Sequence, residues 1–435
     1  MKTIVDALLV AQFPLIITAN SGRNPKTVPL LAQLSTLLTI GVYTSCPMSM
    51  CIPWTHKNYI GTAFGGKNDL LAHIDLLIVL EVDVPWVEAA GNRPRDGARV
   101  FVVDSDPLKT NWGWQHVDAE LLCKADPETA LAQLVAALDV PEVGAKAKAA
   151  TDSGLVTSRK ARLKELRAKW VAAQEEAEAV TSLSLADSGE ARPTVPYVLS
   201  ALRTAVGEQT ASKGAKVLWV NEAISNYPLV WTHLRPEQPG SVIASGGTSL
   251  GYGLGASIGA YLGGLVAKKE YDLVAYVVGD GSYLFGIPAS AFWIARRYNT
   301  VRTTIHVIES GDLRDRCASR SSPSFSTMAA GRYVRRVSGH NGTVLIGVPS
   351  KSPKLSMLGV YPNGLGSTAS GNQLTIGLGP DSPDFSQVAV AAGGAWGKRV
   401  TSVEEVQGVI QEAIRVVLQE KRCAVVDVIL DSINE

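Results

Sequence analysis

Short runs of apolar residues recur along the chain, and most of them end at a glycine, an acid or an asparagine. Runs of about four to eight apolar residues between turn signals are typical of buried parallel strands. Stretches with helical spacing separate these runs, such as Thr27–Leu38, Ile287–Tyr298 and Val400–Leu418. This alternation predicts the α/β fold class, with two doubly wound parallel-sheet domains joined by a charged helical linker. The predicted strands are Pro14–Ala19, Ile40–Tyr43, Leu76–Val82, Val100–Val103, Val217–Val220, Leu273–Val278 and Cys423–Leu430.

The same pattern divides the chain into three parts. Residues 1–140 predict a central, nucleotide-binding-like domain, although no G-x-G-x-x-G turn follows its first strand. Residues 141–195 predict a helical linker, in which Ser158–Val180 is dense in charge, with basic residues first and acids last. Mixed signs at helical spacing favour a solvated connector helix over a basic binding face. Residues 196–435 predict a second α/β domain, interrupted by an anomalous insert at 301–350.

Charge and composition exclude some classes of protein. The 435 residues include 41 Lys and Arg against 40 Asp and Glu, so no net field favours nucleic acid or an anionic membrane. No uninterrupted run of about 18 apolar residues is present, which predicts that no segment spans a membrane. The five cysteines are scattered and odd in number, which favours a reducing compartment over a disulfide framework. A cytoplasmic protein is the simplest prediction.

The stretch Gly279-Asp280-Gly281-Ser282 is the strongest candidate for chemistry. It follows the buried strand Leu273–Val278 and precedes the helical segment Ile287–Tyr298. Glycines in such a turn allow backbone N–H groups to approach phosphate oxygens, and a carboxylate there can coordinate Mg²⁺ or Ca²⁺. The alternative is an ordinary turn between strand and helix, in which Asp280 caps the helix.

A second glycine-dense stretch, 246–255 (GGTSLGYGLG), opens the apolar helix Ala256–Ala267. A helix start of this kind presents bare N–H groups and the positive end of the helix dipole to an anion. Close packing of a helix on a sheet also requires small residues, and this alternative stays open. In the first domain Asp104 follows a strand, where it would cap a helix or contact a ribose; the cap is favoured.

These two stretches resemble a known family. Residues 245–260, SGGTSLGYGLGASIGA, and residues 279–288, GDGSYLFGIP, look like the diphosphate-binding domain of thiamine diphosphate-dependent enzymes. The most similar group is the acetolactate synthase, benzaldehyde lyase and 2-hydroxyacyl-CoA lyase branch. Residues 1–135 resemble the central domain of that family and Lys351–Leu430 its carboxy-terminal part, so the resemblance covers most of the chain. It implies thiamine diphosphate and Mg²⁺ as cofactors.

The resemblance also implies roles for individual residues. Asp280 matches a metal ligand, and Leu250 matches the apolar wedge beneath the bent cofactor. The Thr248 carbonyl matches the acceptor of the aminopyrimidine, and Asn221–Ile224 matches a further loop beside the diphosphate. No residue of this chain matches a catalytic one. The cofactor-binding residues implied are Asn221, Thr248, Ser249, Leu250, Gly279, Asp280, Gly281 and Ser282.

The chain departs from the family in two places. The amino-terminal pyrimidine-binding domain, whose glutamate activates the cofactor, is expected to be absent. The family also places an Asn-Asn pair at the end of the strand after the Gly-Asp-Gly turn, and its second Asn ligates the metal. Ungapped alignment puts Glu309 at that position, and a shift of one residue puts Ser310 there. We interpret Val301–Ser350 as an inserted or mis-spliced segment that displaced the strand carrying the ligand pair.

The resemblance implies a thiamine diphosphate- and Mg²⁺-dependent carboligase or decarboxylase, a lyase or transferase similar to acetolactate synthase. Its substrate would be a 2-oxo acid, an aldehyde or a 2-hydroxyacyl compound. The family's sites form between two subunits, which implies a homodimer, a homotetramer or a hetero-assembly with a pyrimidine-domain chain. The two departures favour a different hypothesis, a catalytically inactive remnant or regulatory binding protein of the same fold. A plain nucleotide-binding protein that uses residues 1–135 is a third hypothesis.

Overall fold

The computed structural model describes residues 1–63, 69–88, 92–109, 117–182, 191–246, 249–269, 271–298, 304–311 and 383–430. The chain forms two compact units. Unit 1 comprises Met1–Ala173 and Arg235–Gly240, and unit 2 comprises Gln174–Leu234 and Ser241–Glu435. Each unit is built around a parallel sheet whose six strands lie within the described residues, as the predicted fold class requires.

The sheet of unit 1 has the strand order β3-β2-β1-β4-β5-β6. The chain runs outward from β1 to β3, returns to the middle at β4, and runs outward the other way. The point where this direction reverses, which we call the switch point, lies between β1 and β4. The strands are β1 (Pro14–Thr18), β2 (Gly41–Ser45), β3 (Tyr59–Ala63), β4 (Leu76–Leu80), β5 (Arg99–Asp104) and β6 (Leu121–Lys124). The helical segments are α1 (Lys2–Val10), η1 (Ser21–Arg23), α2 (Thr27–Leu38), η2 (Asp69–Ala72), α3 (Pro127–Ala137), α4 (Pro141–Asp152) and α5 (Leu155–Ala179), whose last turns lie in unit 2.

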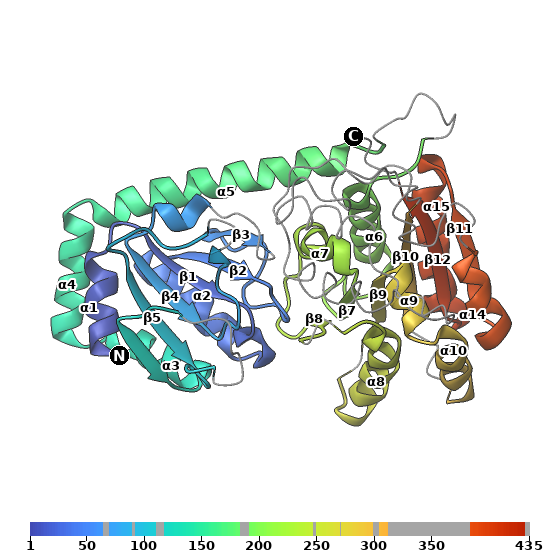
Figure 1. The fold of residues 1–435 in the computed structure, drawn as a ribbon, viewed down its shortest axis with the longest axis horizontal. Coiled ribbons are helices and arrows are strands. Elements are labelled where there is room, and N and C mark those ends of the chain that lie inside the picture. Colours follow the sequence, from blue (N-terminus) through green and yellow to red (C-terminus); the bar gives the residue numbers. More distant parts are fainter. Residues whose placement is uncertain are drawn as a thin grey trace, which may run out of the picture. The chain divides into compact units, whose positions relative to one another are not determined.

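Side chains of the unit 1 strands alternate between two cores. Ile16 and Phe101 pack in the core that α1, α2 and α3 cover, whereas Ile17 and Val79 pack in the core that includes Leu163 of α5. Figure 1 shows the strands of unit 1 with α5 along one side and α3 along the other. Because both faces of the sheet are covered, its central strands β1 and β4 are mostly apolar, which explains why they stand out in the sequence.

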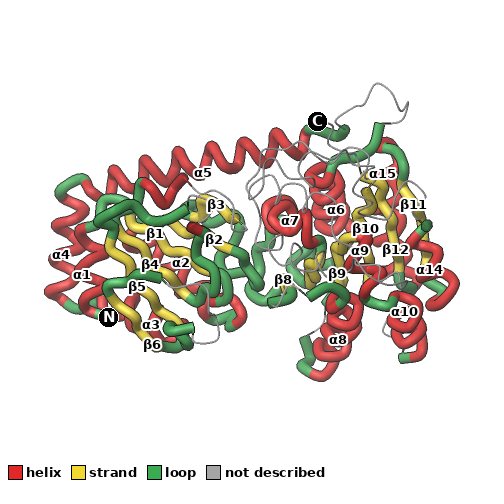
Figure 2. The backbone as a smooth tube through the Cα atoms, in the orientation of Figure 1, coloured by secondary structure: helices red, strands yellow, loops and turns green. Residues whose placement is uncertain are grey.

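The sheet of unit 2 has the order β11-β12-β10-β9-β7-β8, so its switch point lies between β7 and β9. The helices α8, α10 and α14 lie together on one side of the sheet, and α6 packs with α15 (Figure 2). The strands are β7 (Val217–Glu222), β8 (Val242–Ala244), β9 (Leu273–Gly279), β10 (Thr304–Gly311), β11 (Trp396–Val400) and β12 (Ala424–Leu430). The helical segments are α6 (Val195–Gln209), η4 (Ile224–Asn226), α7 (Tyr227–Leu234), α8 (Tyr252–Val266), α9 (Asp280–Phe285), α10 (Pro288–Arg297), α14 (Phe385–Gly393), α15 (Val403–Arg415) and η9 (Val416–Glu420).

One expectation about the stretch 301–350 is wrong. We expected an insert that had displaced a strand, but Thr304–Gly311 is itself the strand β10, paired with β9 on one side and β12 on the other. Its residues include several β-branched ones, which favour strands. The strand has only eight residues, so its apolar pattern is easily overlooked in a stretch of fifty residues without clear periodicity. Residues 312–350, the rest of the predicted insert, lie outside the described residues.

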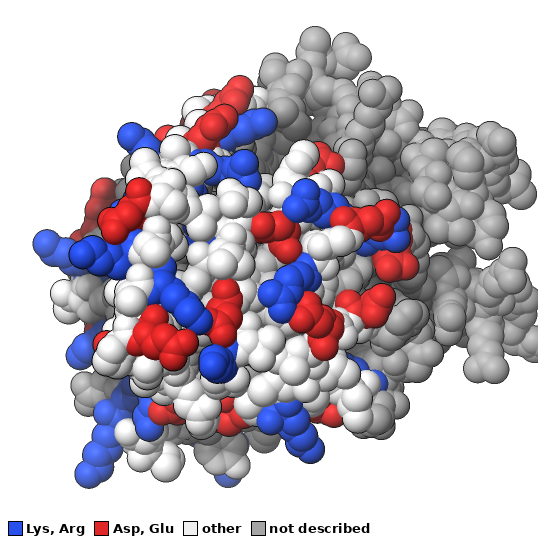
Figure 3. Space-filling model, turned by 90° about the vertical axis from the view of Figure 1, so that its left-hand side faces the viewer, with Lys and Arg blue, Asp and Glu red and all other residues white. Residues whose placement is uncertain are grey.

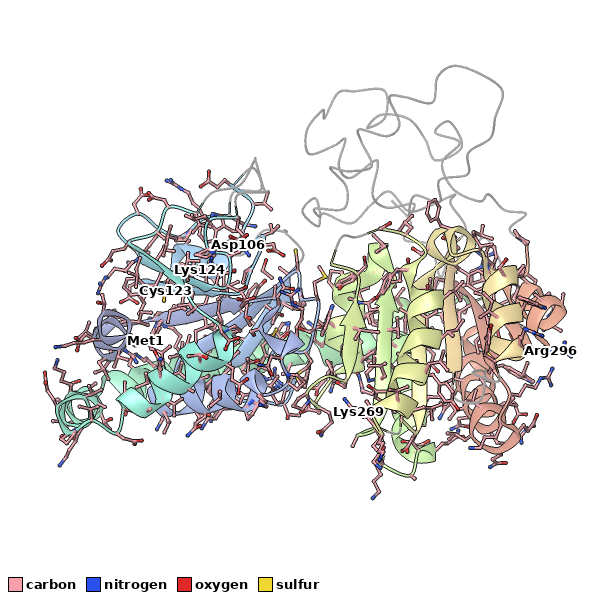
Figure 4. All side chains as sticks on the ribbon, turned by 90° about the horizontal axis from the view of Figure 1, so that it is seen from below. Met1, Asp106, Cys123, Lys124, Lys269 and Arg296 are labelled. Atoms are coloured by element: carbon pink, nitrogen blue, oxygen red, sulfur yellow. The ribbon has the colours of Figure 1, made fainter. Side chains whose placement is uncertain are left out.

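The charged side chains on the surface and the lengths of the helices agree with the predictions from charge and hydropathy. On the face drawn in Figure 3, basic and acidic side chains are interspersed rather than gathered by sign. Among the residues that the structure describes, we find no helix with the length and apolar character that a membrane crossing requires. Lys269 and Arg296, labelled in Figure 4, point outward from unit 2 and are exposed.

Candidate functional site

Two of the predicted loops meet at the switch point of unit 2. The strands β7 and β9 are direct neighbours, and Asn221 pairs with Val277 and Glu222 with Val278. Both strands therefore deliver their carboxyl ends, and the loops that follow, to one edge of the sheet. On the other side of β9, the backbone of Glu309 in β10 pairs with Gly279. Ligands of open α/β sheets bind at this kind of edge, next to the switch point.

Asp280 opens the short helix α9 at this edge. Gly279 precedes the helix in extended conformation, and Asp280 Oδ1 accepts a hydrogen bond of 2.6 Å from the N–H of Gly281. Asp280 is partly exposed, whereas Gly281 and Ser282 are buried. Among the residues that the structure describes, no atom lies within 4 Å of a Cβ added to Gly279. Asp280 is the first residue of α9 and not its cap, since Gly279 is the N-cap and no side chain caps the helix, so the alternative interpretation of Asp280 as a helix cap is wrong.

The start of α8 differs from what the sequence led us to expect. We expected bare N–H groups, but the carboxylate of Glu222 occupies this position. Oε2 of Glu222 accepts from the N–H of Gly253 at 2.9 Å, and Oε1 accepts from Tyr252 at 3.2 Å and from Gly251. The hydroxyl of Tyr276 donates to the same carboxylate. Because an internal anion already takes these N–H groups, the expectation that they are open to a bound anion is wrong.

The glycines at the start of α8 are needed for close packing. Gly251 has a φ of 89°, in the left-handed region, and its Cβ would lie 2.9 Å from backbone atoms of Phe285 and Gly286. A Cβ on Gly253 would lie 2.2 Å from the Tyr276 ring and 2.6 Å from Glu222 Oε2. Gly253 lies against residues of β7 and β9, so the interpretation that small residues allow the helix to pack on the sheet is confirmed there, whereas Gly251 packs against the end of α9.

Burial changes the acidity of the groups around Glu222. Glu222 and Tyr276 are both fully buried in unit 2. Desolvation raises the pKa of Glu222, while the hydrogen bonds from Tyr276 and from the backbone N–H groups oppose this rise. Desolvation, followed by the charge of Glu222, raises the pKa of Tyr276 well above its usual range. Tyr276 therefore remains protonated and acts as a hydrogen-bond donor to the carboxylate.

Asn221 offers an unpaired donor at the same edge. Its side chain is fully buried, and its Oδ1 accepts from the N–H of Ala223 at 3.1 Å. Its Nδ2 has no hydrogen-bond partner among the residues that the structure describes. A buried N–H group without an acceptor is costly, by about 1 to 3 kcal/mol. An acceptor such as a phosphate oxygen fits this position.

The predicted cofactor residues come from three segments. Asn221 is the second-last residue of β7, Ser249 and Leu250 precede α8, and residues 279–282 span the end of β9 and the first turn of α9. Ser249 is exposed and Leu250 is partly buried. Thr248 lies outside the described residues. For Glu309 and Ser310 the structure describes only the backbone, which is part of β10.

Within the described ranges, no group of three or more His, Cys, Asp or Glu side chains is arranged to hold a metal ion. Mg²⁺ is usually held by one or two carboxylates together with waters and the phosphates of its ligand. One partly exposed carboxylate, Asp280, fits that arrangement. The metal ligands Asp280 and Glu309 both stay predictions.

The carboxylate of Asp104 in unit 1 binds other groups of the same unit. Its Oδ1 accepts from the N–H of Asp106 at 2.8 Å and from Lys109 Nζ at 3.1 Å. The contact with Asp106 closes a turn at the end of β5, and Figure 4 shows Asp106 and Lys124 in this part of unit 1. Because this contact closes a turn after β5, Asp104 does not make the helix cap that we favoured.

Comparison with known proteins identifies both parts of the chain. Residues 1–134 match the family model of the thiamine pyrophosphate enzyme, central domain, and residues 223–310 match that of the thiamine pyrophosphate enzyme, C-terminal TPP binding domain. The chain therefore carries the central domain and the TPP-binding domain of thiamine pyrophosphate enzymes. A search of curated proteins found no match.

Two solved structures show the same fold. Benzoylformate decarboxylase from Polynucleobacter necessarius is 16% identical with a TM-score of 0.62, and the match covers 99% of this chain and 64% of that one. The thiamine diphosphate-dependent 4-hydroxybenzoylformate decarboxylase from Rhodococcus jostii RHA1 is 16% identical with a TM-score of 0.60, at the same coverage. This chain thus spans about 64% of the length of these relatives.

Sequence reasoning placed Glu222 in the Asn221–Ile224 stretch without giving it a role of its own, and it missed Tyr276. Both residues lie in apolar strands, whereas the candidate functional residues were predicted mainly in the loops. The one available signal was an acid directly after Val217–Asn221, since an acid at the end of a buried strand requires donors.

Proposed function

We propose that this chain binds the diphosphate end of thiamine diphosphate, together with Mg²⁺, at the carboxyl ends of β7 and β9. The observation that carries the proposal is the meeting of Asn221 and the Gly279–Ser282 turn at the switch point of a domain that matches the TPP-binding model. Asn221 Nδ2 would donate to a phosphate oxygen, and Asp280 would ligate the metal. Glu309 would be a second ligand.

The loops before α8 and after β9 would position the rest of the cofactor. Leu250 would support it from below, and the Thr248 carbonyl would accept from its aminopyrimidine. The backbone N–H groups of Gly281 and Ser282 would contact the diphosphate. When bound, thiamine diphosphate supplies the electron sink for cleavage or formation of a bond next to a carbonyl carbon. The residues of this chain bind and orient it.

The proposed activity is decarboxylation or carboligation of a 2-oxo acid, or cleavage of a 2-hydroxyacyl substrate, in the cytoplasm. Both solved relatives are named as decarboxylases of aryl 2-oxo acids, which supports a 2-oxo acid as the substrate class. We further propose an oligomer, either a homodimer or homotetramer or a hetero-assembly in which a separate pyrimidine-domain chain completes the site. The acetolactate synthase branch remains our proposal for the closest group.

Calorimetric titration with thiamine diphosphate, with and without Mg²⁺, tests the binding step. We expect binding that requires the metal. Release of CO₂ from pyruvate and benzoylformate, and formation of acetolactate, then tests turnover with and without a candidate pyrimidine-domain chain. Binding without turnover under all these conditions would support the alternative of a regulatory binding protein. Absence of metal-dependent binding would overturn the proposed function.

A further inference from the structure

Glu222 connects three segments of the proposed cofactor site. It is the last residue of β7 and directly follows Asn221. Its carboxylate accepts from the N–H groups of Gly251, Tyr252 and Gly253, directly after Leu250. The start of α8 that it holds lies against the end of α9, the helix that begins at Asp280.

The contact between α8 and α9 leaves little freedom for movement. The Cβ position of Gly251 is 2.9 Å from Phe285 and Gly286 backbone atoms, and that of Gly286 is 2.8 Å from Leu254 Cδ1. Gly251 also depends on its left-handed backbone, with φ at 89°. The start of α8 is therefore held by Glu222 on one side and by the end of α9 on the other.

A carboxylate is the group that this position requires. Four donors converge on it, three backbone N–H groups and the Tyr276 hydroxyl, and a carboxylate is a pure acceptor with two oxygens. Its negative charge also complements the positive end of the helix dipole. An amide would present its NH₂ group to the N–H of Gly253, and Glu222 is fully buried, so water cannot take the place of a missing acceptor.

We propose that Glu222 is a positioning residue: its carboxylate, and not a bound anion, occupies the start of α8 and holds Asn221 and Leu250 in register with the Asp280 turn. The effect on the cofactor rests on the proposed function, whereas the occupation of the α8 start does not. The diphosphate would then be contacted from the β9–α9 side and by Asn221, and not by the first N–H groups of α8.

Four variants of the full chain test this inference. E222A removes the carboxylate, E222Q replaces it with an amide, Y276F removes one donor but keeps the acceptor, and E208Q changes an exposed glutamate of α6 in the same unit. Two quantities are measured for each. Amide hydrogen exchange at residues 251–253 reports on the α8 start without cofactor, and calorimetry gives the Kd for thiamine diphosphate with Mg²⁺.

We expect faster exchange at residues 251–253 and a Kd raised by about tenfold in E222A and E222Q, because buried N–H groups lose their acceptor. In E222A, sodium acetate should restore the slow exchange and the wild-type Kd, because acetate can fill the vacated carboxylate position. Sodium chloride at the same concentration should restore neither. E208Q should leave the Kd within about twofold of wild type, and Y276F, which removes one donor but keeps the acceptor, should raise the Kd less than E222A does.

The outcomes separate the inference from the proposed function. Slow exchange in E222A without acetate would overturn the inference whether or not the wild type binds thiamine diphosphate. An unchanged Kd in both Glu222 variants, with a wild type that binds, would overturn its positioning role alone. If E222A fails to fold, the exchange and Kd of E222Q decide the same questions. A wild type that does not bind, with acetate-dependent exchange in E222A, would overturn only the proposed function.

Discussion

The two units carry acids at equivalent edges of their sheets but use them differently. In unit 1, Asp83 and Asp104 follow neighbouring strands next to the switch point between β1 and β4. Lys109 Nζ lies 2.9 Å from Asp83 Oδ1 and 3.0 Å from Asp104 Oδ2. Burial lowers the pKa of Lys109, but the hydrogen bonds and charges of the two aspartates outweigh this effect and leave the pKa raised. This edge balances its charge within the unit.

At the edge of unit 2, backbone N–H groups and a phenol, rather than a lysine, meet the buried acid Glu222. Beside it, Asn221 keeps a buried donor without a partner among the described residues. The comparison teaches that acids at a switch point do not by themselves define a ligand site. A site is indicated where the edge leaves donors unpaired, as in unit 2, and not where a salt bridge saturates it, as in unit 1.

The largest difference between the two edges should appear when one acid of each is neutralised. D280N keeps an oxygen that can accept from Gly281 but removes the charge proposed to ligate Mg²⁺. We expect the Kd for thiamine diphosphate with Mg²⁺ to rise by about a hundredfold, the upper range for partners of a bound metal. D104N in unit 1 should leave that Kd unchanged. Equal effects of the two substitutions in calorimetric titration would break the distinction between the edges.

K109M tests whether the edge of unit 1 is held together by its own charges. The substitution leaves Asp104, which is 1% exposed, without its cation. We expect the free energy of unfolding of unit 1 to fall by about 2 kcal/mol, below the usual range for a fully buried pair because Lys109 is partly exposed. Urea unfolding measures the change, with K148M, an exposed lysine of α4, as the matched control. The double variant K109M/D104N should regain part of the loss, and a K109M midpoint equal to wild type would contradict the prediction.

Much of the fold was predictable because buried parallel strands are apolar on both faces. The predicted helix Thr27–Leu38 has the bounds of α2, and Leu273–Val278 is β9 short of one residue. The strands β3, β6, β8 and β11 were not predicted; β6 and β11 are partly exposed, and β8 has three residues. All four lie at sheet edges, where a strand loses the long apolar run that marks a central one.

The candidate site was predictable only where its signal is local. The Gly279–Ser282 turn was found because its glycines and its acid are adjacent in the chain. The partners of Glu222 lie 29 residues away at Gly251 and 54 residues away at Tyr276. No pattern along the sequence connects them, and only the fold shows that an internal carboxylate fills the start of α8.

Two glycines of α8 test how tightly the edge of unit 2 is packed. In G253A the new methyl group would collide with the Tyr276 ring and with Glu222, so we expect a loss of about 2 kcal/mol in the free energy of unfolding of unit 2. In G255A, two residues further along the same helix, no atom of the described residues lies within 4 Å of the new methyl group. That substitution should stabilise the unit by about 0.5 kcal/mol, because alanine favours helix interiors. Chemical denaturation of both variants measures the contrast, and opposite signs are the expected result.

The smallest expected effect concerns the unpaired donor. N221D keeps the oxygen that accepts from Ala223 but replaces the Nδ2 donor with a second acceptor. We expect the Kd for thiamine diphosphate to rise by about tenfold, since a phosphate oxygen would lose its donor. The matched variant in unit 1 is N20D, because Asn20 Nδ2 already donates to Asp83 at 3.1 Å. N20D should lower the unfolding free energy of unit 1, where it places two carboxylates together, without changing the Kd. If N20D weakened cofactor binding as much as N221D, the open donor at the unit 2 edge would have no special role.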